Sequence, residues 1–343
     1  MITEDGSYEG RALKITWNAS PTPPPRAQIT QASGLCFTDD GMIVLVAGEK
    51  GTWSLPGGHP EPGETIEQAF VREVREEACA IVEHLVYLGA QQVDDPSAPS
   101  GPTRYYQTRF WARVHLEPFH AQFEILQRRL VATKDFLSVL SWGHTRIAQA
   151  LLNSAIEQEL TQLIRSTPWF MSILEAVREC DPPDWLVGAG VIRNLVWDHL
   201  HQYQTSTPLA DVDVVFFDPQ DVRPERDRMV QQQLAQRLPH VAWEATNQAA
   251  VHLWYKDVFG FSVPAFHSSE EAVGTWPETA TSVAVRLLPT DGISIVAPCG
   301  LSDLFSMILR RNPSRVTQEI FMQRLHSKQI LRKWPRAQVI YEA

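Results

Sequence analysis

GHPEPGETIEQAFVREVREEACA, from Gly58 to Ala80, is the stretch of sequence that decides the fold of the first half of the chain. Residues 65–78 are rich in good helix formers and contain neither Gly nor Pro. They follow a turn built on Pro62 and Gly63, which is typical of the segment before a helix. The stretch therefore predicts a helix over residues 65–78.

Three glutamates lie on one face of this predicted helix. Glu73, Glu76 and Glu77 follow the i, i+3, i+4 spacing that brings side chains to the same side. Three like charges repel each other, whereas a solvated helix would alternate its charges. A divalent cation would explain the arrangement, because Mg2+ and Mn2+ prefer carboxylate oxygens together with substrate phosphates. The alternative, a merely acidic amphipathic helix, does not account for the turn, the spacing and Arg72 together.

The same stretch resembles the Nudix box. The pattern of that family is Gly, five residues, Glu, seven residues, then Arg-Glu-apolar-any-Glu-Glu-any-Gly-apolar. Gly58, Glu64 and Arg72 occupy the first fixed positions, and the lead-in WSLPGG at 53–58 is also typical of the family. Cys79 stands where the family has Gly, at a helix end where a left-handed backbone costs a non-Gly residue roughly 1–2 kcal/mol.

The resemblance implies an α/β/α sandwich that hydrolyses a nucleoside diphosphate linked to another group, with a divalent cation. The three glutamates would hold the cation together with the carbonyl oxygen of Gly58. Arg72 would orient a glutamate and pair with Glu64. Glu124 lies in a loop after a long strand, where many family members place an additional acidic ligand or base. One of these acids would activate the attacking water.

The segments around the box fit such a sandwich, and the resemblance covers roughly residues 8–155. Strands are predicted over residues 11–17, 28–37, 42–47, 81–92 and 104–114, loops over 94–103 and 117–126, and helices over 135–140, 143–159 and 155–166. We therefore predict a first domain over residues 1–158 and a second over 159–343, with the boundary on a helix.

The second half contains a strand, a Gly-rich turn, a helix and an acidic strand in succession. A short apolar strand at 185–187 leads into Gly188 and Gly190, and a helix is predicted over 191–203. Asp211 and Asp213 then begin an apolar strand, where residues i and i+2 face the same way about 6.5–7 Å apart. Two carboxylates at that spacing can hold metal ions around a triphosphate, and the Gly turn lets backbone approach its phosphates.

These elements together resemble the nucleotidyltransferase superfamily, the fold of polymerase-β-like enzymes. GAGVIRNLVWDHLH, TPLADVDVVFFD, NQAAVHLWY and WPETATSVAVRL resemble more narrowly a bacterial group of nucleotidyltransferase-like proteins. The superfamily usually needs a third carboxylate on a later strand, and Glu244 in the segment 241–245 is the candidate. Arg193 and Asn194, on the helix after the turn, would orient a nucleotide, and the alternative for both is a simple place on the helix surface.

Two hypotheses stand for this half of the chain. In the first, Asp211 and Asp213 hold Mg2+ while Glu244 positions or deprotonates an acceptor that receives a nucleoside monophosphate from a triphosphate. In the second, the domain is a non-catalytic nucleotide sensor or docking module that regulates the hydrolase. Lys and Arg outnumber acids from Leu301 onward, and we interpret that excess as a solvated helix face.

Composition limits the class of protein. The 343 residues are 44% hydrophobic and carry a net charge of −10, which argues against general nucleic-acid binding through a basic surface. No apolar run reaches the length of a membrane span, and the acidic start MITEDGSYEG argues against a secretory signal. Four widely spaced cysteines form no CxxC pair, so reduced thiols in the cytoplasm are expected. We predict a bifunctional cytoplasmic enzyme with nucleotide substrates and no membrane partner.

Overall fold

The computed structural model describes residues 1–8, 10–99 and 101–341, and the chain divides into two compact units, Met1–Glu159 and Leu160–Ala343. The division falls within helix α3 (Arg146–Arg165). Among the described residues, no helix combines the length and the apolar character that a membrane span requires.

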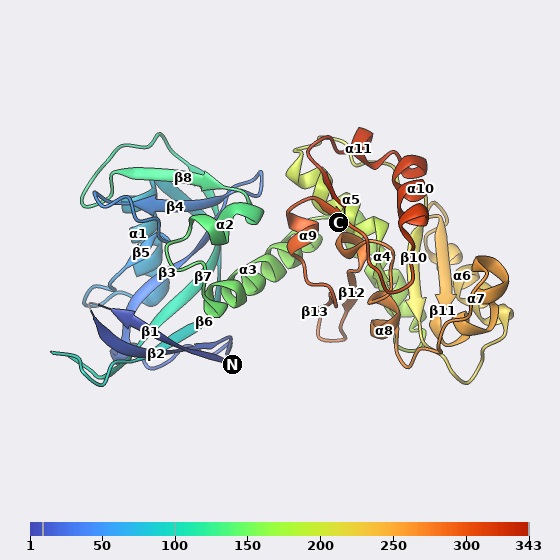
Figure 1. Cartoon of the computed structure of the whole chain (residues 1–343), viewed down its shortest axis with the longest axis horizontal. Coiled ribbons are helices and arrows are strands. Elements are labelled where there is room, and N and C mark those ends of the chain that lie inside the picture. Colours follow the sequence, from blue (N-terminus) through green and yellow to red (C-terminus); the bar gives the residue numbers. More distant parts are fainter. Residues whose placement is uncertain (9, 100, 342–343) are drawn as a thin grey trace. The chain divides into compact units, whose positions relative to one another are not determined.

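The first unit is built on a mixed β-sheet (Figure 1). Its strands pair in the order β1-β2-β6-β7-β3-β4-β8, and β5 pairs with β3. The elements in chain order are β1 (Ile2–Tyr8), β2 (Arg11–Asn18), β3 (Ile29–Phe37), β4 (Ile43–Ala47), β5 (Gly57–Gly58), α1 (Ile66–Ala78), β6 (Ala80–Asp94), β7 (Arg104–Leu116), β8 (Gln127–Val131), α2 (Thr133–Val139) and α3.

Helices cover both faces of this sheet. On one face, α1 buries an apolar side that includes Phe70 and Val74, and the ring of Phe70 stacks on Phe110 of β7 with centroids 5.0 Å apart. On the other face, the indole of Trp111 donates a hydrogen bond of 2.9 Å to Glu159 of α3. The predicted α/β/α sandwich is confirmed, and α1 is fixed to the sheet through its apolar side while Glu73, Glu76 and Glu77 are half-buried.

The structure corrects the predicted elements at three places. β1 falls in the polar first segment, for which no strand was predicted, and it is held by backbone pairing with β2. β8 follows the predicted loop and pairs with β4. The two helices predicted over 143–159 and 155–166 are the single helix α3. Polar edge strands such as β1 are stabilised by ladder hydrogen bonds, which hydrophobic periodicity does not register.

The second unit holds another mixed sheet, with strand order β11-β10-β9-β12-β13, and a separate parallel pair of β14 and β15. Its elements are α4 (Pro168–Cys180), β9 (Leu186–Gly188), α5 (Gly190–Leu200), β10 (Val212–Phe216), α6 (Pro224–Arg237), β11 (Trp243–Asn247), α7 (Val251–Phe259), α8 (Ser269–Val273), β12 (Ala284–Leu287), β13 (Ile293–Val296), α9 (Ser302–Phe305), β14 (Ile308–Arg310), α10 (Gln318–Lys328), α11 (Ile330–Lys333) and β15 (Gln338–Ile340).

β10 lies in the interior of this sheet. It pairs antiparallel with β9 and parallel with β11, beside which α6 lies (Figure 1). Val214 and Phe216 of β10 are fully buried, whereas Asp211 precedes the strand and is exposed. The apolar strand therefore holds the acidic residues at its start in fixed positions at the end of the sheet.

Candidate active sites

Helix α1 begins and ends at residues with defined capping geometry. The side chain of Thr65 accepts a hydrogen bond from the backbone N–H of Gln68, and the Gln68 side chain accepts one from the N–H of Thr65, which completes a capping box. At the other end Cys79 adopts the left-handed conformation, with φ 46° and ψ 54°. The conformation expected where the family has Gly is therefore present, although a cysteine must adopt it.

Arg72 connects the turn to the helix. Its guanidinium donates two hydrogen bonds to Glu64, of 2.9 and 3.1 Å, and one of 3.1 Å to the carbonyl oxygen of His59. Its Nη1 donates to Glu73 at 2.9 Å and to Glu76 at 3.1 Å. A single side chain therefore fixes the loop of the box and orients two of the three glutamates, as its fork of donors allows.

The surroundings of Glu73 and Glu77 disfavour the ionised form of each carboxyl group and raise its pKa. Burial is the main cause that raises the pKa of Glu77 to about 7, and neighbouring Glu73 and Glu124 add to it. The backbone N–H of Gly57 opposes this shift through a hydrogen bond of 2.7 Å to the Glu77 carboxylate. Burial also raises the pKa of Glu73, although Arg72 lowers it. Glu124 is thus close enough to act electrostatically on both glutamates.

The backbone of Gly58 lies directly against the Glu73 carboxylate. A Cβ atom added at Gly58 would lie 2.5 Å from Glu73 Oε1, closer than any ordinary contact. β5, which contains Gly58, is held against β3 through the pairing of Gly58 with Ala32. The Glu73 carboxylate therefore packs directly against the Gly58 backbone, and a side chain at position 58 would displace it.

Replacing Gly58 by Ala should lower the activity of this site by about 10²-fold, because the new methyl group displaces the Glu73 carboxylate by a fraction of an ångström or more. The fold should persist, since the clash is with the end of a flexible side chain. Steady-state kinetics and thermal unfolding measure the two effects. Gly292→Ala, where the added Cβ meets Leu288 at an ordinary 3.4 Å, is the control. Full activity in Gly58→Ala would contradict this account of the site.

The second unit brings Asp211, Asp213 and Glu244 together, and we call this group the aspartate site. Each offers a carboxylate oxygen, and these oxygens all lie within 4.8 Å of one another. Asp213 and Glu244 are register partners on β10 and β11, and Gly188 of β9 is the register partner of Asp213 on the other side. Three carboxylates at this separation form a donor set that suits one or two hard divalent cations.

The glutamates of α1 differ from the aspartate site because their carboxylate oxygens already accept hydrogen bonds from other residues. Among the described residues, the aspartate site is where three acids bring carboxylate oxygens within 4.8 Å of one another. Glu73 and Glu76 accept hydrogen bonds from Arg72, and Glu77 accepts one from the N–H of Gly57. A cation at α1 would therefore have to draw these carboxylates together, while the aspartate site already has its donors in place.

A cavity of about 310 Å3 contains the aspartate site, and we call it the aspartate cavity. Gly190 at the start of α5 lines it, and a Cβ added there would meet no atom within 4 Å. Ala189 between the two glycines has φ 58° and ψ −121°, a conformation that L residues rarely adopt. This turn leaves open space in front of the N-terminus of α5, where the helix dipole favours an anion.

Arg324 and Lys328 of α10 also line the aspartate cavity. Both lower the pKa of Asp213, although burial and the neighbouring Asp211 and Glu244 raise it overall to about 6. Arg324 is half-buried and Lys328 is exposed, and their place on the cavity wall adds a contact with the acids that the interpretation as a solvated helix face did not include. The excess of Lys and Arg after Leu301 marked this segment as a possible phosphate contact. The sequence could not show that these two residues lie near Asp213, because they are far from it along the chain.

Asp213→Asn should raise the unfolding temperature of the metal-free protein at pH 7, by on the order of 5 °C. The pKa of Asp213 is higher in the fold than its ordinary value, so its ionised form opposes folding at pH 7 and its protonated form does not. The advantage of Asn should shrink as the pH falls from 7 towards 4. Thermal unfolding with a chelator measures it, and equal unfolding temperatures at pH 7 would contradict the prediction.

Two adjacent residues of α5, Arg193 and Asn194, line different cavities. Arg193 lines the aspartate cavity, and its guanidinium donates to Asn194 Oδ1 at 2.7 Å and lies 4.8 Å from the ring centroid of Trp334. Asn194 lines a second cavity of about 450 Å3. Both side chains are buried, so neither has the helix-surface place considered as the alternative.

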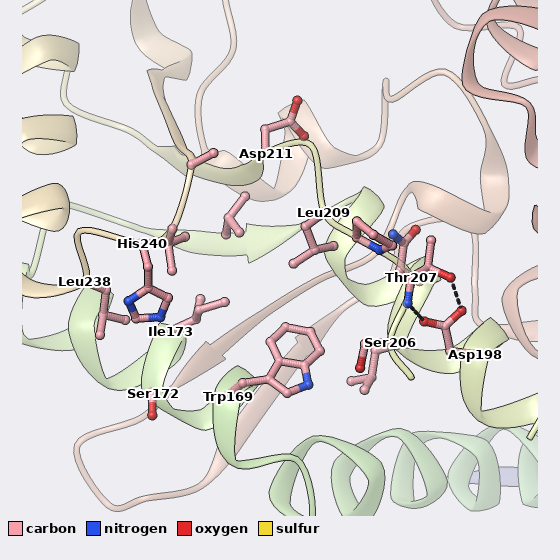
Figure 2. Close-up of a pocket in the computed structure, with 16 residues that line it drawn as sticks. Trp169, Ser172, Ile173, Asp198, Ser206, Thr207, Leu209, Asp211, Leu238 and His240 are labelled. Atoms are coloured by element: carbon pink, nitrogen blue, oxygen red, sulfur yellow. Dashed lines mark hydrogen bonds between the residues drawn. The ribbon is translucent and has the colours of Figure 1, made fainter. Parts of the chain in front are cut away.

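The second cavity adjoins the aspartate site (Figure 2). Trp169 and His240 line it, and Asp211 lies at its edge and lines both cavities. Asp198 accepts hydrogen bonds of 2.6 Å from the N–H and the hydroxyl of Thr207. These bonds fix the segment that leads from α5 to Asp211.

Comparison with known families gives one match in each unit. Residues 29–151 match the model of the NUDIX domain, and residues 175–339 match the model of a nucleotidyltransferase family. A segment of 43 residues is 49% identical to the 8-oxo-dGDP phosphatase NUDT18 of Mus musculus, and it covers 12% of this chain and 13% of that protein.

Two solved structures each resemble part of the chain. A structure described as a CCA-adding enzyme head domain is 28% identical, with a TM-score of 0.47, and the alignment covers 54% of this chain and 96% of that one. The pyrophosphohydrolase BsRppH of Bacillus subtilis is 20% identical, with a TM-score of 0.38, and the alignment covers 46% of this chain and 98% of that one.

The predicted resemblances are confirmed, and both families indicate an enzyme. The chain joins a domain of the NUDIX family, over residues 29–151, to a domain of the nucleotidyltransferase family, over residues 175–339.

Proposed function

We propose that the first unit is a hydrolase that cleaves a nucleoside diphosphate linked to another moiety, with Mg2+ or Mn2+. The observation that carries this proposal is the arrangement around Arg72, which holds Glu64, Glu73 and Glu76 while Gly58 lies against Glu73. When bound, the cation would neutralise charge on the diphosphate and lower the pKa of a water molecule.

In this mechanism the chain's own residues position the reactants and accept a proton. Glu73, Glu76 and Glu77, with the carbonyl oxygen of Gly58, would hold the cation. Water attacks one phosphorus, the bridging P–O bond breaks, and a nucleoside monophosphate and a phosphorylated second product leave. One of the α1 glutamates or Glu124 accepts the proton of the attacking water, and a carboxylate whose pKa is raised is suited to that role.

We propose that the second unit transfers a nucleoside monophosphate from a triphosphate to an acceptor. The observation that carries it is the aspartate site, whose carboxylate oxygens lie within 4.8 Å of one another in a cavity with cationic walls. An acceptor hydroxyl attacks the α-phosphorus, the bond to the β-phosphate oxygen breaks, and pyrophosphate leaves. Glu244 positions the acceptor or accepts its proton, while Arg324 and Lys328 face the negative charge of the leaving group.

A cytoplasmic location is part of the proposal. All four cysteines are free thiols in the structure, which fits a reducing compartment. Small nucleotides are the proposed ligands, and the net charge of −10 supports substrates held by local cationic groups rather than a nucleic acid held by a basic surface.

A panel of nucleoside diphosphate derivatives and nucleoside triphosphates, incubated with the full chain and Mg2+, tests both activities. Chromatography of the products should show nucleoside monophosphate released from a diphosphate derivative and pyrophosphate released from a triphosphate. No monophosphate from any derivative would contradict the hydrolase. Triphosphate binding without pyrophosphate release would make the second unit a nucleotide sensor instead of a transferase.

A further inference from the structure

A cavity of about 770 Å3 lies in the first unit, and we call it the sheet cavity. Strands β1, β2, β3, β6 and β7 supply its walls, together with Trp142 and residues at the start of α3. His59 lines the cavity, and its carbonyl oxygen accepts a hydrogen bond from Arg72. The sheet cavity therefore extends to the loop that holds the glutamates of α1, and its volume suits a nucleotide-sized molecule.

Arg109 of β7 lines this cavity and is only 4% exposed. Every hydrogen bond that the structure gives its guanidinium ends on a neutral oxygen. The acceptors are Ser33 Oγ at 2.7 Å, Gln107 Oε1 at 2.8 Å, Gln31 Oε1 and the Thr108 carbonyl at 3.2 Å each, and Gln91 Oε1. The remaining donor, Nε, is buried and has no hydrogen-bond partner among the described residues.

The positive charge of Arg109 is therefore not compensated. Neutral acceptors orient a guanidinium, but they do not supply the opposite charge that a buried ion needs. Burial alone lowers the pKa of Arg109 to about 9, and no acid counteracts it. Arg113, farther along the same strand, differs in this respect, because its guanidinium pairs with the buried carboxylate of Glu159.

Asp95 is a second buried polar residue of the sheet cavity, and one of its carboxylate oxygens accepts no hydrogen bond from the described residues. It lines the cavity, is 3% exposed, and its Oδ1 has no hydrogen-bond partner among the described residues. Its other oxygen pairs with Arg11. The cavity wall thus contains a cation without a counter-ion and a carboxylate, and each has one buried atom without a hydrogen-bond partner among the described residues. A ligand with an anionic group and a hydroxyl or amino donor would satisfy both.

We propose that Arg109 binds a phosphate group of the substrate of the first unit, and that Asp95 accepts a hydrogen bond from a hydroxyl or amino group of the same molecule. The proposal rests on the hydrolase function proposed above. A phosphate supplies the opposite charge that Arg109 lacks, and its oxygens would replace neutral glutamine oxygens as acceptors of the guanidinium. The phosphate belongs either to the diphosphate that is cleaved or to the moiety linked to it.

The first test measures binding without metal, so that the glutamates of α1 do not take part. Calorimetry with inorganic pyrophosphate in a chelator is run on the full chain, on Arg109→Gln and on Arg109→Lys. Arg109→Gln should lose a binding component that the wild type has, at least about 10-fold in affinity, and Arg109→Lys should retain part of it. Arg104→Gln, on the same strand but outside the cavity, should bind like the wild type. Equal binding by Arg109→Gln and the wild type would overturn the proposal.

Thermal unfolding separates this role from a structural one. Arg109→Gln removes a buried charge but leaves the oxygens of Ser33, Gln91 and Gln107 without their donor, so a loss of stability is expected in either role. Metal-free pyrophosphate should raise the unfolding temperature of the wild type more than that of Arg109→Gln, whereas a purely structural arginine would give equal shifts. An equal pyrophosphate-induced shift in Arg109→Gln and in the wild type would assign the residue to structure.

Hydrolysis kinetics identify the source of the phosphate. With a nucleoside diphosphate linked to a neutral sugar, Arg109→Gln should raise KM at least about 10-fold with little change in kcat if the cleaved diphosphate is the ligand. If only a substrate with a phosphorylated sugar shows the effect, the linked moiety carries the phosphate. An unchanged KM for both substrates would overturn the proposal. A wild type that binds pyrophosphate through Arg109 but hydrolyses nothing would refute the hydrolase function and leave the binding site intact.

Discussion

Glu76→Gln should lower the kcat for diphosphate hydrolysis by about 10³-fold or more, the largest effect expected in the first unit. Gln has the size of Glu but carries no charge, so it removes a hard anionic ligand without opening a cavity. Glu76 accepts a hydrogen bond of 3.1 Å from Arg72, and a Gln oxygen can still accept it, so the helix should keep its place. Release of nucleoside monophosphate, measured by chromatography, reports the loss.

Glu67→Gln is the matched control for this change. Glu67 lies on the same helix, one charge is lost in the same way, and none of the contacts to Arg72 involves it. Its activity should stay within about twofold of the wild type, as expected for a surface substitution away from the site. Full hydrolysis by Glu76→Gln would refute the assignment of the glutamates of α1 to the cation. Pyrophosphate release by the second unit should be unchanged in both variants.

Asp213→Asn should lower pyrophosphate release from a nucleoside triphosphate by about 10³-fold or more, the largest effect expected in the second unit. Asp213 lies between Gly188 and Glu244 across three adjacent strands, so its carboxylate is the central ligand of the aspartate site. Asn keeps the shape of the side chain and removes its charge. The same variant should lose the stabilisation that Mg2+ gives the wild type in thermal unfolding.

Asp257→Asn on α7 is the control, because Asp257 is exposed and lies outside the aspartate cavity. It should release pyrophosphate at the wild-type rate. Undiminished release by Asp213→Asn would show that the aspartate site does not carry the transfer. A protein that binds a triphosphate through Asp213, yet releases no pyrophosphate as the wild type, would place the second unit among nucleotide sensors.

Local sequence patterns are sufficient to predict which acids lie side by side when those acids belong to one helix or strand. The spacing of Glu73, Glu76 and Glu77 predicts a shared helix face, and the turn before the helix predicts its start near Thr65. Helical geometry fixes these relations within a few residues, whatever surrounds the helix. The two aspartates of the second unit were identified from their spacing of two residues, although only Asp213 lies on β10 and Asp211 immediately precedes it.

Contacts between distant segments could not be predicted in the same way. No local pattern places Lys328 beside Asp213, because the contact depends on how α10 packs against the sheet. The burial of Arg109 among neutral side chains could not be predicted from a local pattern either. It lies in an ordinary alternating strand, and only the pairing of β7 with β3 and β6 surrounds it with neutral side chains and buries it.

The sequence by itself determined the two families, the fold class and the acids that follow helix or strand periodicity, because these depend on local spacing. Only the tertiary structure decided which charges are compensated. Arg113 pairs with Glu159, whereas Arg109 pairs with no carboxylate in the part of the chain that the structure describes, although both are arginines on one strand. Burial and the identity of the neighbours set the electrostatic free energy of a charge, and both arise when distant segments pack together.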